Sequence, residues 1–135
     1  MFLGQINSYF IPSGEANTII PIKTLSNTND NVVNKGGVIS FLKSGMYNID
    51  ASISVTGTGA DNITVTIFAD DGARITVPAT IPTPPDGATT STVNVSLVDA
   101  IRVILTRYNS VAKIYIGVGS SAVTVDGYIR VEYVR

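Results

Sequence analysis

Residues 47–56 alternate strictly between apolar and polar side chains, and this pattern constrains the fold more than any other feature of the chain. The odd-numbered positions from Tyr47 to Val55 are apolar, and the even-numbered ones are polar. A period of two is that of a β-strand with one face in the core. The same alternation occurs in 63–67 and 93–97. In 101–105 and 114–118 apolar residues fall on both strand faces, as in strands covered on both sides.

The composition also favours sheets over helices. The chain holds 17 Ile, 16 Val and 15 Thr but only five Leu, and β-branched side chains favour pleated structure. Glycine-containing pairs separate the apolar runs, and we interpret Gly45, Asp71, Gly72, Asp126 and Gly127 as turn residues. Short strands separated by such turns predict an all-β sandwich or barrel.

A length of 135 residues fits one domain. We expect residues 1–17 to form an N-terminal arm or a first edge strand, and residues 18–135 to form a single domain. The segment 78–87 contains four prolines. Because proline cannot donate a hydrogen bond to a sheet, we predict a loop or a sheet edge there.

The charges exclude several function classes. The net charge is −1, and the chain contains no His and no Cys. Nucleic-acid binding would lack its electrostatic source of affinity, and the usual nucleophile–base pairs and transition-metal ligands are missing. We therefore expect no catalytic residue, no cofactor and no metal. Only 14% of the residues are charged, against about 25% in an average domain, so we expect a partner to cover part of the surface.

The first residues lack the features of a signal peptide, and no apolar run approaches the ~20 residues of a membrane-spanning helix. We therefore expect the protein to be made in a cytoplasm and not to associate with a membrane.

The stretch from Val38 to Arg74 resembles the trimeric jelly-roll superfamily of the complement globular head and tumour necrosis factor. A strand leads into Gly45-Met46-Tyr47, an alternating strand follows, and a second strand runs into Asp71-Gly72. The resemblance is strongest to the versions found in bacteriophages and spore coats. Residues 9–25 are similar to the first strands of those domains, 91–106 to the paired central strands, and 126–131 to the closing strand beside the N-terminal one.

This resemblance implies an antiparallel jelly-roll β-sandwich that assembles as a homotrimer. No collagen-like stalk and no secretion signal precede the domain, which favours the bacteriophage form. We therefore expect a non-enzymatic virion protein, made in the bacterial host cytoplasm, that serves as a head fibre, capsid decoration or fibre knob. Residues 1–17 are our candidate for docking to the capsid or to other virion proteins. The alternative is a receptor-binding tip that recognises a host cell-surface glycan.

Aromatic residues are the remaining candidates for a contact site. Two interpretations apply to five of the tyrosines. They either fill the core or the trimer seam, or they bind a glycan. These residues are Tyr9, Tyr108, Tyr115, Tyr128 and Tyr133. Lys43-Ser44 lacks the spacing of a Ser–Lys enzyme and fits a polar turn. Asp70 and Asp71, with Asp61, are candidate calcium ligands, but the spacing of a calcium-binding loop is absent. We therefore favour a hairpin turn for the Asp-Gly pair.

Overall fold

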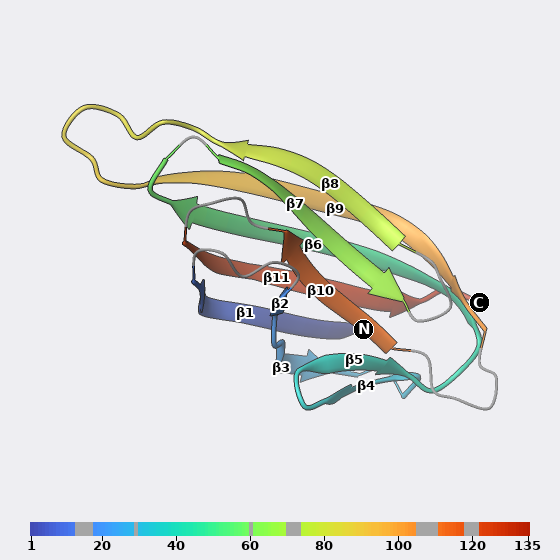
Figure 1. Ribbon diagram of the computed structural model, residues 1–135. Coiled ribbons are helices and arrows are strands. Elements are labelled where there is room, and N and C mark those ends of the chain that lie inside the picture. Colours follow the sequence, from blue (N-terminus) through green and yellow to red (C-terminus); the bar gives the residue numbers. More distant parts are fainter. Residues whose placement is uncertain (13–17, 29, 60, 70–73, 105–110, 118–121) are drawn as a thin grey trace.

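The computed structural model describes residues 1–12, 18–28, 30–59, 61–69, 74–104, 111–117 and 122–135, and these contain strands and no helix (Figure 1). The first six strands are β1 (Phe2–Ile11), β2 (Thr18–Ile19), β3 (Lys23–Asn27), β4 (Val32–Lys35), β5 (Val38–Phe41) and β6 (Gly45–Gly57). The remaining five are β7 (Asp61–Ala69), β8 (Arg74–Ile81), β9 (Ser91–Val103), β10 (Val111–Gly117) and β11 (Val123–Tyr133). Within these residues, no helix is long and apolar enough to cross a membrane.

The strands form two packed antiparallel sheets (Figure 1). One is five-stranded, in the order β3-β1-β11-β6-β9. The other runs β4-β5-β10-β7-β8, with β2 paired to β10. Neighbours within a sheet are mostly distant in sequence, as in a jelly roll. The predicted antiparallel jelly-roll sandwich is confirmed, and β11 closes the sheet beside β1 as the resemblance implied.

The core lies between the sheets and follows the alternation that the sequence predicted. The apolar side chains of β6 point inward: Tyr47, Ile49, Ala51, Ile53 and Val55 are all 0% exposed. The intervening polar residues point away from the core. The six-stranded sheet supplies the opposite layer, which includes Ile39, Phe41, Ile63, Val65 and Ile81.

Strand β1 is neither an arm nor an edge strand, which corrects our expectation for the described part of residues 1–17; residues 13–17 lie outside the described residues. Strand β1 lies inside its sheet, between β3 and β11. Phe2, Ile6 and Ile11 are buried in the core. The domain therefore includes this strand, and residues 2–11 are not a free tether for docking to a virion.

Two further expectations are corrected, for 91–106 and for Asp126-Gly127. The segment 91–106, compared above with paired strands, contains one long strand, β9, which pairs with β6 without a break from Ser91 to Val103. The expectation of a loop or a sheet edge at 78–87 agrees with the structure, because Pro78 lies within edge strand β8 and the loop begins at Pro82. Asp126 and Gly127 are not a turn but the middle of β11. Gly45 begins β6 directly after the chain bends, and Asp71 and Gly72 lie outside the described residues.

Position 127 of β11 requires a glycine, because the neighbouring strand β6 leaves no space for a Cβ there. A Cβ at Gly127 would lie 2.5 Å from the Ser52 carbonyl oxygen and 3.0 Å from the Ile53 Cα. Gly127→Ala should therefore lower the free energy of unfolding by about 1–3 kcal/mol, as overpacking does, measured by urea denaturation. Gly59→Ala is the matched control, since its Cβ would meet nothing within 4 Å. Equal denaturation midpoints for the two variants would contradict this account.

Candidate assembly surface

The outer face of the five-stranded sheet is the best candidate for a functional surface. We define this outer face by the side chains of β1, β11, β6 and β9 that point away from the core. The register aligns them in rows across the strands. In the central row, Tyr128 of β11 lies between Gln5 of β1 and Ser52 of β6, and Ser52 faces Ser96 of β9. Because β11 is the third of five strands, Tyr128 lies near the middle of the outer face.

Short polar side chains cover much of the outer face over β6 and β9, and two pairs of them are hydrogen-bonded across the strands. Ser54 Oγ donates to Asn94 Oδ1 at 2.7 Å, and the hydroxyls of Thr56 and Thr92 are 2.7 Å apart. Asp50 lies directly opposite Arg130 in the β6–β11 register, and opposite charges across a strand pair stabilise it. Over β6 and β9 the outward side chains are therefore mostly short, and Arg102 is the long charged one among them.

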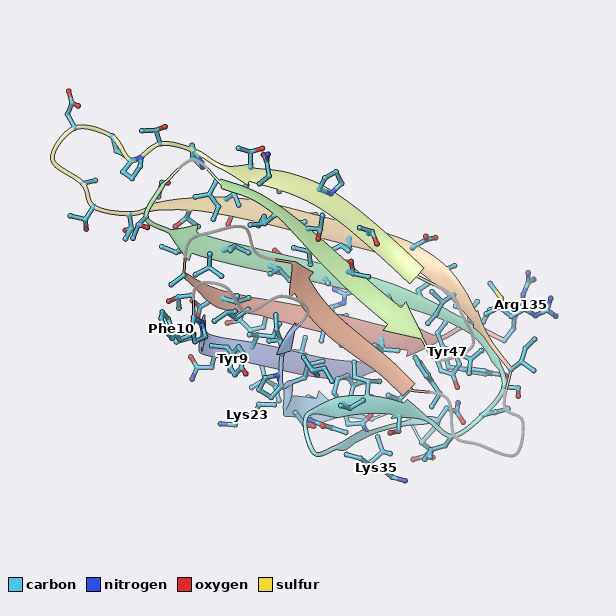
Figure 2. All side chains as sticks on the ribbon, viewed as in Figure 1. Tyr9, Phe10, Lys23, Lys35, Tyr47 and Arg135 are labelled. Atoms are coloured by element: carbon cyan, nitrogen blue, oxygen red, sulfur yellow. The ribbon has the colours of Figure 1, made fainter. Side chains whose placement is uncertain are left out.

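Three large apolar or aromatic side chains stand out from this polar background. Phe10 is 59% exposed, Tyr128 51% and Val98 75%. Figure 2 shows Tyr9 and Phe10 at one end of β1, far from Tyr47 and Arg135 at the other end of the sheet. Single exposed apolar side chains are common on protein surfaces, but these three lie on one sheet face, and this makes the outer face our candidate contact surface.

A β-bulge explains why Phe10 points outward. The register of β1 against β11 shifts between Ile6 and Tyr9, so the alternation of β1 changes phase there. Ser8, in the bulge, has a φ of 47°, which is uncommon for a residue other than glycine. The Asp126 carboxylate accepts hydrogen bonds from the Ser8 backbone N–H at 2.9 Å and from Ser8 Oγ at 3.2 Å. Asp126 thus supports the bulge that turns Phe10 toward solvent.

The tyrosines singled out in the sequence differ in their surroundings. Tyr128 is exposed on the outer face, whereas Tyr9 and Tyr133 are partly buried and pack against the core. Tyr115 lies on β10 of the other sheet, opposite Ile19 and Thr66, and its side chain is not among those described. Tyr108 lies outside the described residues. Among the tyrosines whose side chains are described, the structure does not bring Tyr9, Tyr128 and Tyr133 together as one patch.

An aromatic cluster closes the end of the sandwich where the chain terminates. The Tyr47 ring lies 4.7 Å from that of Phe41 and 5.3 Å from that of Tyr133, measured between centroids. The Tyr47 hydroxyl donates to the Lys43 carbonyl oxygen at 2.6 Å. Lys43 Nζ lies 4.7 Å from the Tyr133 ring centroid, a cation–π contact. These contacts serve packing, and they leave Lys43 engaged with an aromatic ring rather than poised to activate Ser44.

Tyr47→Phe should reduce stability by about 1 kcal/mol near pH 8, the usual net contribution of one hydrogen bond. Burial, with a smaller contribution from Tyr133, raises the pKa of Tyr47 above its ordinary 10.0. The unfolded chain therefore loses this proton at lower pH than the folded one. The stabilisation is complete below pH 10 and declines as pH rises above it.

The difference in unfolding free energy between the wild type and Tyr47→Phe should consequently shrink above about pH 10. Urea denaturation of both proteins over this pH range measures it. A difference that stays constant or grows would contradict the assignment.

The described part of the chain contains no group of three or more acidic side chains that could hold a metal ion. Asp70 and Asp71, considered above as calcium ligands, lie outside the described residues, and the Asp61 side chain is not described.

The sequence matches no known protein-family profile, and no curated protein matches it. Solved structures do share its architecture. PRD1 vertex protein P5 is 14% identical with a TM-score of 0.61, covering 95% of this chain and 93% of its own. Murine APRIL, solved at pH 5.0, is 9% identical with a TM-score of 0.60, covering 96% of this chain and 98% of its own. The chain therefore shares the jelly-roll fold of these two structures, which is the fold that the resemblance of Val38 to Arg74 implied.

Proposed function

We propose that this protein is a non-enzymatic virion component that assembles as a homotrimer and is displayed on the surface of a bacteriophage particle, as a head fibre or capsid decoration. The observation that carries the proposal is the outer face of the five-stranded sheet, with Phe10, Tyr128 and Val98 exposed on it. The shared fold with a phage vertex protein supports the virion role. The described residues contain no metal-binding cluster that would favour an enzymatic function over this structural one.

The size of the outer face fits an intersubunit contact. The four strands that define the outer face are 10 to 13 residues long. At ~4.8 Å between strands and ~3.3 Å per residue they give a face of roughly 750 Å². A standard stable interface buries about 800 Å² on each partner. Three copies that pack this face around a three-fold axis would cover the exposed aromatic residues. Their mutual binding also raises stability with protein concentration.

Light scattering coupled to size exclusion tests the assembly. We expect a mass near three times 14.2 kDa over a range of concentrations, with a midpoint of thermal unfolding that rises with concentration. A stable monomer would count against the proposal. Immunolabelling of purified particles then tests the virion location, and particles that lack the protein would count against that part alone.

The alternative function, recognition of a host cell-surface glycan, also has one observation in its favour. Phe10 and Tyr128 present exposed aromatic rings, and sugars bind such rings. This alternative requires the outer face to be free in solution. Saturable glycan binding by a monomeric protein, lost in Tyr128→Ala, would favour it over the trimer.

A further inference from the structure

The loop of residues 82–90, which joins β8 to β9, extends beyond both sheets at the end away from the two termini (Figure 1). The register agrees with the picture. At this end of the sheet Ser91 pairs with Gly57, whereas Val103 pairs with Gly45 at the other end, where Arg135 bonds to Met46. All residues of the loop except Pro84 are exposed. The loop is thus accessible to another enzyme.

Its sequence is rich in hydroxyl side chains and proline. Residues 80–92 read TIPTPPDGATTST, which gives six Ser or Thr and three Pro in thirteen positions. Segments rich in Ser, Thr and Pro are typical of O-glycosylated stretches. Composition alone does not identify acceptors, but the hydrogen bonds of the loop separate its hydroxyls into two groups.

Three of the hydroxyls are engaged in holding the base of the loop. Ser91 Oγ donates to the Pro82 carbonyl oxygen. The Thr92 hydroxyl pairs with Thr56 at 2.7 Å, and Thr80 Oγ1 donates to Asn62 Oδ1 at 3.0 Å. The other three, on Thr83, Thr89 and Thr90, are exposed and make no hydrogen bond to the described part of the chain.

We propose that Thr83, Thr89 and Thr90 are O-glycosylation acceptors. In the transfer, the Thr Oγ1 attacks the anomeric carbon of a nucleoside-diphosphate sugar held by a separate glycosyltransferase. The Oγ1–C1 bond forms, the bond from C1 to the phosphate oxygen breaks, the hydroxyl proton passes to a base of the transferase, and the nucleoside diphosphate leaves. The backbone of Thr83 suits this reaction, because the following Pro84 disfavours helical backbone and keeps the acceptor extended.

The charges around the loop favour a neutral sugar over a phosphate at these hydroxyls. No Lys or Arg occurs in residues 75–101, and Asp86 lies within the loop. A phosphate would bring a charge of about −1.5 to −2 and would need basic partners to bind it. A sugar brings no charge, and it extends into solvent without disturbing the core.

Intact-mass measurement with fragment-ion site mapping tests the proposal on the protein purified from the source that naturally makes it. We expect hexose or N-acetylhexosamine increments on Thr83, Thr89 and Thr90 and none on Ser91 or Thr92. The variant T83V/T89V/T90V, which keeps side-chain shape, should lose all increments, while the control Thr92→Val should retain them. Both variants should keep the circular dichroism of the wild type.

An unmodified mass would overturn the proposal. So would a phosphate increment, or sugars on Ser91 or Thr92 in place of the three free hydroxyls. None of these outcomes bears on the trimer, which the light-scattering mass tests separately.

Discussion

Replacing Tyr128 with arginine is expected to convert the proposed trimer into a folded monomer. Tyr128 is half exposed at the centre of the outer face. In a three-fold assembly, a residue near the axis approaches its own copies, so one substitution brings three positive charges together. Like charges forced together at an interface cost several kcal/mol. Because each 1.4 kcal/mol is a tenfold change, the dissociation constant should rise by at least about a hundredfold.

The fold of the subunit should survive this change. The Tyr128 side chain points away from the core, and its strand neighbours Gln5 and Ser52 are polar. The mass from light scattering should therefore fall to one third, while the far-ultraviolet circular dichroism of the subunit stays that of a β-protein. Raising the salt concentration should restore part of the trimer, because salt screens charge repulsion.

Thr64→Arg is the matched control. Thr64 is exposed on β7, opposite Pro78 on the outer side of the other sheet. The same charge placed there should leave the trimer intact. A trimer that persists in Tyr128→Arg, or that dissociates equally in Thr64→Arg, would show that the three copies meet through another surface.

The alternating strands were predictable from the sequence because a period of two directly encodes which face is buried. The side chains from Tyr47 to Val55 demonstrate this, since every apolar position predicted to face the core does so. The closing position of β11 beside β1 came from the resemblance rather than from periodicity, and the register confirms it. Local pattern and family likeness together were sufficient for the fold class.

The outer face was less predictable because it depends on long-range register. Asp126-Gly127 has the composition of a hairpin turn, but the glycine serves a close approach to Ser52, 75 residues earlier in the chain. Phe10 was not identified as a contact residue, since the bulge that turns it outward is supported by Asp126 at the far end of the sequence. The only local signal is that the alternation of residues 2–11 changes phase near Ser8.

The weak patterning of residues 2–11 also concealed an interior strand. Before the bulge the even-numbered residues point inward, and after it the odd-numbered ones do. The broken alternation suggested an arm, although the segment pairs on both sides with β3 and β11. A single inserted residue is therefore enough to hide a central strand from an analysis of periodicity.

Deleting residues 1–11 is expected to unfold the subunit rather than merely release it from a particle. The deletion removes Phe2, Ile6 and Ile11, which are all at most 1% exposed. Truncating one such Phe or Ile to alanine costs about 2–5 kcal/mol. The summed loss of stability for all three is comparable to the whole free energy of unfolding of a typical domain, roughly 5–15 kcal/mol. The exposed edges of β11 and β3 would also promote aggregation.

Point variants separate this structural role from a docking role. Phe2→Ala and Ile6→Ala should each lower the free energy of unfolding by about 2–5 kcal/mol in urea denaturation. Leu25→Ala, on edge strand β3 and 45% exposed, is the control and should stay within about 0.5 kcal/mol of wild type. If the deleted chain instead unfolds cooperatively at the wild-type urea midpoint, β1 contributes nothing to the core, and residues 1–11 regain their place as a candidate tether to the virion.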